Sequence, residues 1–374
     1  MGGGAVTPRM ADPLLFQPFE LRGLEIRNRL WVAPMCQYSA DADGELAGAP
    51  NDWHLQHLGA LGRGGAGLVV VEATAVSPEG RISPNDLGLW NDEQQQAFAR
   101  IVPVVQAHGA RIGIQIAHAG RKASTYNPWL PGQPEGAVPI GEGGWQPVAP
   151  SAAVFPGLAD PRALTADEVR ETIAAFLATA DRAVQAGFDV VEVHAAHGYL
   201  LHEFLSPLSN LRDDEYGGSP ENRARPLREI VRGIRAAHPE LPIVVRVSGD
   251  EWVEGGFDVE AAAQLVGWLR EDGADMVDAS SAGNTADAEI AIGPSYQVWI
   301  AERLRREGLP VSAVGLITSA AQAESILATG QADVVSLGRP LLANPHLPIT
   351  WAHELRAPSA AALIPPQYRR ARFA

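Results

Sequence analysis

One pattern recurs through the chain: a glycine, then a small or acidic residue, then a run of β-branched and other apolar residues. The copies are GGAGLVVVEAT (64–74), HGARIGIQIAH (108–118), AGFDVVEVHAA (186–196), DGADMVDASS (272–281), GLPVSAVGLI (308–317) and GQADVVSLGRP (330–340). LWVAPM (30–35) and PIVVRVSG (242–249) add two further apolar runs. Near-continuous apolar strands are typical of parallel sheets that are covered on both faces. The pattern therefore predicts eight buried strands.

Helical patterns alternate with these strands. Residues 167–187 and 259–273 have apolar residues at three- and four-residue spacing and end in glycine, and Thr165 is the predicted N-cap of the first helix. Eight strands alternating with helices predict the α/β class, as a single (β/α)8 barrel. The alternative is an open doubly wound sheet, but no Gly-x-Gly-x-x-Gly turn follows the first strand.

Three segments fall outside the alternation. We expect residues 1–12 to be a disordered extension, residues 13–358 to form the barrel and residues 359–374 to form a C-terminal tail. Residues 119–163 are rich in Pro, Gly and Trp, and they predict a lid or binding loop after the third strand. Such a tail is ordered only where it docks, for example on a neighbouring subunit.

The charge and cysteine content limit the function classes. A formal net charge of −15 disfavours nucleic acid as a partner, and no polybasic run suggests a membrane surface. The chain also lacks a long apolar run and an N-terminal signal peptide. The single cysteine, Cys36, excludes an intrachain disulfide and sites built on several cysteines. We therefore expect a cytoplasmic protein.

Polar residues concentrate where the predicted strands end. The fourth strand ends at His194, His197 and Tyr199, two imidazoles and a phenol that can hold an oxygen atom and supply a proton. The other strand ends carry Pro34, Met35, Cys36, Tyr38, Glu72, Ala73, Thr74, Gln115, His118, Arg246, Ser280, Ser281, Gly315, Gly338 and Arg339. Because the carboxyl ends of barrel strands meet at one mouth, these residues predict a single site.

Several of these residues allow two interpretations each. Ser-Leu-Gly-Arg-Pro (336–340) is either a phosphate-binding turn or a tight turn with a surface arginine. Arg246 interrupts an apolar strand and faces either a carboxylate or a bound anion. Gln115 makes either a core hydrogen bond or a contact with the edge of a heterocycle. Cys36 is a nucleophile or a buried spectator.

The histidines could also bind a metal. His194 and His197 would need a third ligand, for which Glu192 is a candidate. The predicted site has few carboxylates, however, and its arginines would repel a cation, so we expect no metal. His54 and His57 have three-residue spacing on a predicted helix and are interpreted as structural.

Taken together in chain order, six stretches of the sequence resemble the Old Yellow Enzyme family of flavin-dependent ene-reductases. The resemblance covers roughly residues 13–345 and the end of the tail. Cys36 with Tyr38, and a tail containing Gln-Tyr-Arg-Arg (367–370), resemble its thermophilic-like branch of NADPH dehydrogenases and xenobiotic reductases. The matching stretches are 33–38, 71–76, 115–122, 194–201, 206–218 and 336–340.

The resemblance implies FMN over the barrel mouth, reduced by NADPH or NADH. Cys36 would tune the flavin potential, and Arg246 would lie near N1 and the C2 carbonyl, where it stabilises the reduced flavin. The implied cofactor contacts are Ala33, Pro34, Met35, Cys36, Ala73, Gln115, Arg246, Gly315, Gly338 and Arg339.

The resemblance also implies a substrate, an activated alkene. His194 and His197 would bind its carbonyl or nitro oxygen, Tyr199 would protonate the α-carbon, and Tyr38 would touch the substrate. A homodimer or homotetramer is implied, in which Arg370 enters a neighbouring site. The segment after residue 370 departs from the family pattern, so the choice between residues 369 and 370 stays open.

Three alternative functions are compatible with the same residues. The chain could be another FMN-barrel oxidoreductase, such as a dehydrogenase or amine-oxidising relative. It could also be a xenobiotic or nitro-compound reductase, or a barrel that binds a flavin or phosphate ligand without turnover. Within 206–218 we expect a structural brace for the loop after the fourth strand. Its members are Asn210, Arg212, Asp213, Tyr216, Gly217 and Gly218.

Overall fold

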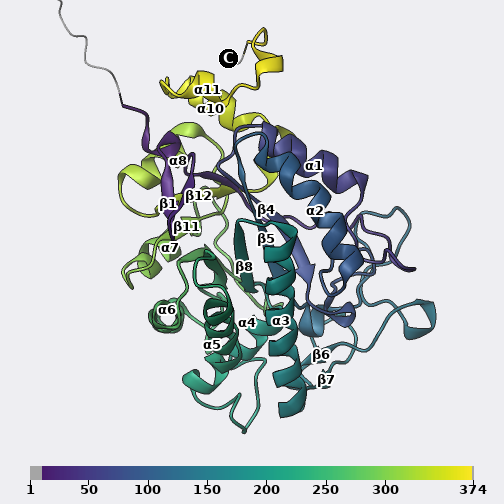
Figure 1. Ribbon diagram of the computed structural model, residues 1–374. Coiled ribbons are helices and arrows are strands. Elements are labelled where there is room, and N and C mark those ends of the chain that lie inside the picture. The colour runs from purple at the N-terminus through teal and green to yellow at the C-terminus, as the bar shows by residue number, and fades with distance from the viewer. Residues whose placement is uncertain (1–10, 373–374) are drawn as a thin grey trace, which may run out of the picture.

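The computed structural model describes residues 11–372 and has a closed barrel of parallel strands at its centre (Figure 1). The barrel strands pair in chain order, and the last strand pairs with the first. They are β3 (Leu30–Val32), β4 (Leu68–Ala75), β5 (Arg111–Ala117), β8 (Val190–Ala195), β9 (Ile243–Ser248), β10 (Met276–Ser280), β11 (Val311–Ala313) and β12 (Val334–Leu337). The predicted (β/α)8 barrel is confirmed, and the open sheet is excluded.

Helices surround the barrel and bury their apolar faces against the strands (Figure 1). They are α1 (Asp52–Arg63), α2 (Asp92–Gln106), α3 (Ala166–Ala186), α4 (Leu200–Leu205), α5 (Pro220–Ala237), α6 (Val259–Asp272), α7 (Val298–Arg305), α8 (Ala320–Ala328), α9 (Arg339–Ala343), α10 (Leu347–Glu354) and α11 (Ala360–Leu363). Within residues 11–372, none of them is both long and apolar enough to cross a bilayer.

The ends of the long helices follow local sequence signals. Thr165 caps α3 by accepting a hydrogen bond from the backbone of Glu168, whose carboxylate accepts one from the backbone of Thr165. At the other end Gly187 has φ 95°, and Gly273 after α6 has φ 99°. Both values lie in the left-handed region, where glycine ends a helix without a Cβ clash. The predicted N-cap and C-caps are confirmed.

A short antiparallel hairpin closes the amino end of the barrel. It consists of β1 (Phe19–Leu21) and β2 (Leu24–Ile26), and Leu21 and Ile26 belong to one buried cluster with the first residues of the barrel strands. That cluster also contains Trp31, Leu68, Val70, Val190, Val244, Met276 and Val334. An apolar plug at this end leaves the carboxyl ends of the strands as the open face for a site.

The segment after β5 contains short elements of its own. These are 3-10 turns at Gly120–Lys122 (η3) and Ile140–Glu142 (η4) and a parallel pair formed by β6 (Val148–Ala149) and β7 (Arg162–Ala163). Figure 1 shows β6 and β7 at the end of the molecule opposite α10 and α11. The insertion therefore lies away from the tail.

The C-terminal tail packs on its own chain beside the end of α1. The ring of Tyr368 lies 5.6 Å from the guanidinium of Arg63 and 5.6 Å from the ring of His346. Residues 1–10, which make up most of the predicted N-terminal extension, lie outside the described residues. The division into extension, barrel and tail stays a prediction.

Candidate active site

The end of β8 brings three predicted site residues together. His194 is the fifth residue of the strand, His197 follows it with φ 61°, and Tyr199 is the N-cap of α4. The ring of His194 lies 5.2 Å from that of His197 and 5.2 Å from that of Tyr199. A left-handed residue at the changeover turns the chain sharply, and this turn keeps the three rings within one cluster.

Neighbouring strands hold His197 in place. Its backbone N–H donates to the Oγ of Ser248 at the end of β9, and its Nε2 lies 2.7 Å from the Oγ of Ser280 at the end of β10. Burial and the charge of Arg246 lower the pKa of both His194 and His197 well below the usual range. Both rings are therefore neutral at pH 7, and each has one N–H to donate.

Cys36, Tyr38 and Tyr199 pack around a second small cluster at the ends of β3 and β8. Burial raises the pKa of the Cys36 thiol, and the charge of Asp86 raises it further. Burial likewise raises the pKa of both tyrosines. The thiol is therefore protonated near pH 7, which disfavours Cys36 as a nucleophile.

A cavity of about 530 Å³ opens at the ends of β9 to β12, and Ser280, which contacts His197, lines it. Four predicted cofactor residues line it: Arg246, Gly315, Gly338 and Arg339. The rest of its lining includes Ser280, Tyr296, Gln297, Thr318 and Ser336. At Gly338 a Cβ atom would lie 3.4 Å from the Sδ of Met35, so this predicted residue borders the same region.

A buried charge network includes Arg246, which lies opposite His194 on the neighbouring strand and lines the cavity. The Nε of Arg246 lies 3.3 Å from the Oδ2 of Asp278, and Gln115 donates from its Nε2 to the Oε1 of Glu192 at 2.6 Å. Burial and the charge of Asp278 raise the pKa of Glu192 to about 8. Arg246 thus faces both a carboxylate and the cavity, whereas Gln115 makes the core hydrogen bond.

These residues fit FMN. Glycine and arginine at the end of β12 provide backbone N–H groups and a cation for a phosphate, as barrels do beyond their last strands. In the described part of the chain, the buried Nδ1 of His194 has no hydrogen-bond partner, and the Nε of Arg246 has only its ion pair with Asp278. Unpartnered buried polar atoms beside a cavity are typical of a ligand site.

Comparison with known proteins decides the family. Residues 14–357 match the model of the NADH:flavin oxidoreductase / NADH oxidase family. The chain belongs to this family. It is an oxidoreductase that uses FMN as its cofactor and NAD(P)H as its electron donor.

Relatives of this flavin oxidoreductase are similar to it in sequence or structure over most of its length. It is 45% identical to an NADPH dehydrogenase of Geobacillus thermodenitrificans (strain NG80-2), over 96% of this chain and 98% of that protein. An Old Yellow Enzyme homologue from Zymomonas mobilis has a TM-score of 0.75 at 28% identity and covers 91% of this chain and 93% of its own. The predicted Old Yellow Enzyme family is confirmed.

A second solved structure is longer than this flavin oxidoreductase. A 2-naphthoyl-CoA reductase, solved with 2-naphthoyl-CoA, has a TM-score of 0.81 at 26% identity. The match covers 91% of this chain but 52% of that one. The chain therefore spans about half the length of that reductase.

The insertion of the flavin oxidoreductase reaches the predicted substrate residue Tyr38. Asn127 donates from its Nδ2 to the backbone carbonyl of Tyr38 at 2.9 Å, and the ring of Trp129 lies edge-on to the ring of Tyr38 at 5.7 Å. Sequence analysis predicted that the insertion is a lid or binding loop but named neither residue. Composition alone does not tell which loop residue faces the strand ends.

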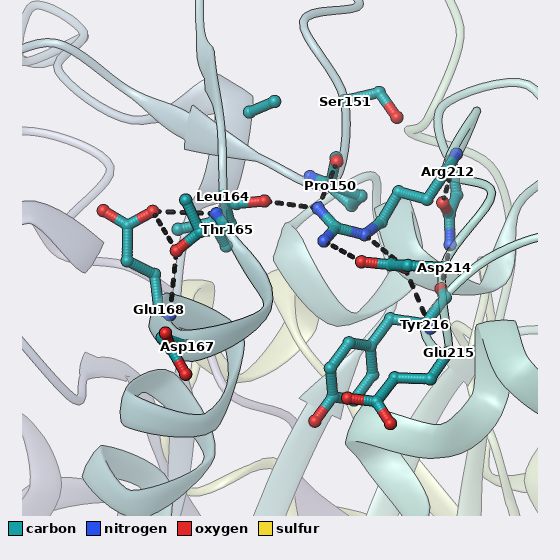
Figure 2. Close-up of polar contacts among 12 residues, drawn as sticks. Pro150, Ser151, Leu164, Thr165, Asp167, Glu168, Arg212, Asp214, Glu215 and Tyr216 are labelled. Carbon is teal, nitrogen blue, oxygen red and sulfur yellow. Dashed lines mark hydrogen bonds and ion pairs between the residues drawn. The ribbon is translucent and has the colours of Figure 1, made fainter.

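Figure 2 shows the motif that we interpreted as a brace. Arg212 donates to the backbone carbonyls of Pro150 and Leu164 and pairs with Asp214, so it links the insertion to the loop after α4. Asn210 donates to the backbone carbonyls of Phe204 and Tyr216, each at 2.8 Å. These contacts are structural and lie outside the histidine cluster.

One predicted site residue, Arg370, and the two histidines interpreted as structural, His54 and His57, lie outside the cluster of His194, His197 and Tyr199. Arg370 is exposed in the tail, which lies at the end of the molecule opposite the insertion (Figure 1), so it does not enter the site of its own chain. His54 lies on α1, where its Nδ1 accepts from the backbone N–H of Asn51 as part of a capping box, and the ring of His57 stacks on Trp53.

Proposed function

We propose that this chain is an FMN-dependent ene-reductase that reduces the double bond of an activated alkene, such as an enone, enal, maleimide or nitroalkene. The observation that supports it most is the cluster of two neutral histidines and a protonated tyrosine beside the FMN cavity. A protein that only stores a flavin has no use for a buried proton donor. Bound FMN supplies hydride chemistry, accepting hydride from NAD(P)H and passing it to carbon.

The residues that hold the cofactor in this proposal come from six strand ends. Arg246 provides positive charge beside the flavin ring system, and Gly338 and Arg339 bind the phosphate of FMN. The full set is Ala33, Pro34, Met35, Cys36, Ala73, Gln115, Arg246, Gly315, Gly338 and Arg339. Cys36 in this set adjusts the potential of the cofactor through its protonated thiol.

The substrate is bound and protonated by side chains of this chain. His194 and His197 each donate an N–H to the substrate's carbonyl or nitro oxygen, which draws electron density from the double bond. Tyr199 then protonates the α-carbon as general acid, and Tyr38 covers the substrate. Because these groups are largely buried, water competes poorly for the reacting carbon.

Visible spectroscopy of the purified protein tests the proposal. Flavin absorption should bleach with anaerobic NADPH and return with cyclohexenone. If NADPH bleaches the protein but cyclohexenone, maleimide and a nitroalkene all fail to restore the colour, the ene-reductase proposal is wrong. A His194→Ala/His197→Ala variant should keep FMN and lose enone binding, whereas His57→Ala on α1, where the ring stacks on Trp53, should retain it.

We also propose a homodimer or homotetramer in which Arg370 enters the neighbouring subunit's site. The support is its exposure at the end of an ordered tail that points away from its own site. Removal of residues 367–374 and Arg370→Ala should both raise KM for the alkene, while Arg369→Ala should not. A monomer in sedimentation equilibrium, or equal effects of the two arginine variants, would contradict this assignment.

A further inference from the structure

The chain has a single lysine, and that lysine lies at the active site. Lys122 is the only lysine among 29 Lys and Arg residues, so every other position in that set is arginine. It ends η3, directly after β5. Lysine carries a compact point charge, whereas arginine carries a broad planar one. One lysine in a chain that otherwise uses arginine points to a position that requires the ammonium group.

The ammonium of Lys122 joins two loops of the site. Its Nζ donates to the backbone carbonyls of His197 and Gly283, each at 2.9 Å. These residues follow β8 and β10, the two strands that supply His194 and Ser280. The carbonyl of His197 belongs to the residue with φ 61°, so Lys122 holds the turn that shapes the cluster.

The same ammonium faces two aromatic rings. Its Nζ lies 5.1 Å from the ring centroid of Tyr199 and 4.9 Å from that of Phe155 in the insertion. A cation over an aromatic ring is attracted to its negative face. The attraction grows when the ring belongs to a phenolate, because the ring then shares a full negative charge.

We propose that Lys122 is a positioning residue for proton transfer, whose positive charge stabilises the phenolate left on Tyr199 after that side chain delivers its proton. In this step the O–H bond of Tyr199 breaks, and the proton forms the new C–H bond at the substrate's α-carbon. The electron pair remains on the phenol oxygen until water returns a proton. The inference rests on the proposed ene-reductase function, in which Tyr199 is the general acid.

The charge of Lys122 depends on pH in the working range. The pKa of Lys122 is lowered to about 8, chiefly by desolvation; the charge of Glu203 on α4 opposes this shift, and the charge of Arg121 on η3 adds to it. His194 and His197 also face it and stay neutral. Burial raises the pKa of Glu203 to about 8 as well, so a change in rate near this pH has two possible sources.

A single lysine makes the two sources separable. Holoenzyme grown with ¹³Cε-lysine gives one side-chain resonance, whose pH titration reports Lys122 alone. We expect the rate at which cyclohexenone reoxidises the reduced holoenzyme to fall as pH rises and this resonance shifts to that of the neutral amine. The neutral amine cannot stabilise the phenolate. Glu203→Gln should leave this correspondence in place. An enone rate that stays level across the lysine midpoint would overturn the proposal.

A variant series distinguishes this role from a structural one. Lys122→Met should slow reoxidation by cyclohexenone about tenfold, a size within the range of a cation–π contact. It should hardly affect reoxidation by dichlorophenolindophenol, which forms no C–H bond. In a Tyr199→Phe background the same substitution should have little effect on the enone rate. Equal slowing with both oxidants would mean that Lys122 only supports the fold.

The outcomes also separate this inference from the proposed function. If the parent enzyme reduces no activated alkene, the proposed function is wrong. If it does, and the enone rate ignores both the titration and the substitution of Lys122, only the present inference is wrong. Should Lys122→Met fail to fold, the labelled parent holoenzyme still provides the decisive titration.

Discussion

The Nε2 atom of His197 lies 2.7 Å from the Oγ atom of Ser280. The contact joins the loop after β8 to the end of β10 and fixes the orientation of the imidazole. A neutral ring carries one proton, and a serine hydroxyl that donates to Nε2 leaves that proton on Nδ1. Because Ser280 engages Nε2, Nδ1 is the nitrogen of His197 that remains for a substrate oxygen, and the proposed function requires the hydroxyl to donate to Nε2.

Ser280→Ala should therefore weaken alkene binding without releasing FMN. Loss of one hydrogen bond of about 1 kcal/mol corresponds to a rise of roughly fivefold in KM. Steady-state kinetics with cyclohexenone measures the effect. Ser281→Ala is the matched control, because the Oγ of Ser281 donates to Gln297 at 2.6 Å. A KM that rises equally in both variants would rule out an orienting role specific to Ser280.

Arg246 is expected to stabilise the fold as well as the cofactor. Its side chain and that of Asp278 are both nearly fully buried, so Arg246→Met leaves the carboxylates of Asp278 and Glu192 without their cation. Removing one partner of a buried pair costs about 3–5 kcal/mol. Urea denaturation should show this loss in the free energy of unfolding, and flavin fluorescence should show weaker FMN retention.

A double variant separates the two roles of Arg246. Arg246→Met/Asp278→Asn removes one unpaired carboxylate along with the cation, so it should recover part of the stability. It should not recover FMN retention, because the cofactor still lacks the positive charge. Recovery of both properties would show that Arg246 serves Asp278 alone.

The sequence predicted the barrel well because each strand and helix carries its own signal. Apolar runs such as 68–75 and glycine ends such as Gly187 and Gly273 are local features, and barrel closure then follows from alternation. Contacts between distant loops carry no such signal. The pairing of Arg246 with Asp278 required the register of β9 beside β10, which places these two residues opposite each other.

The same reason explains what sequence analysis left out of the site. Lys122 lies within a stretch that supported the resemblance, yet no pattern shows that its ammonium meets the carbonyls of His197 and Gly283. Asn127 and Trp129 belong to an insertion without periodicity. Their contacts with Tyr38 depend on how that insertion folds back over β3.

Buried His118 should make the protein less stable in acid. Burial lowers its pKa to about 4, and its Nδ1 accepts a hydrogen bond from the backbone N–H of Gly120 at 3.0 Å. Between about pH 6.5 and 4 the unfolded chain binds a proton at this residue that the folded chain does not, so stability falls as pH falls through that window. The full effect is about 3 kcal/mol.

His118→Asn should flatten this pH dependence. The Oδ1 of asparagine can accept the same hydrogen bond from Gly120, but the side chain does not titrate in this range. The free energy of unfolding, measured by urea denaturation from pH 7 to pH 4, should fall less steeply in the variant by up to about 1.4 kcal/mol per pH unit. Parallel curves for parent and variant would show that His118 is not held neutral in the folded state.

Trp129 should act on substrate choice rather than on stability. Its side chain is 64% exposed, yet its ring lies edge-on to Tyr38, and its backbone N–H donates to Asn127, which in turn donates to the carbonyl of Tyr38. An aromatic substituent that projects from the site would meet this ring, and an aromatic pair contributes about 0.5–1.5 kcal/mol beyond its buried area. Trp129→Ala should therefore raise KM for N-phenylmaleimide about three- to tenfold and leave KM for maleimide nearly unchanged.

Trp299→Ala on α7 removes another partly exposed indole, at 41% exposure, and should change neither value. A Trp129→Ala enzyme that handles both maleimides as the parent does would place Trp129 outside the substrate's reach.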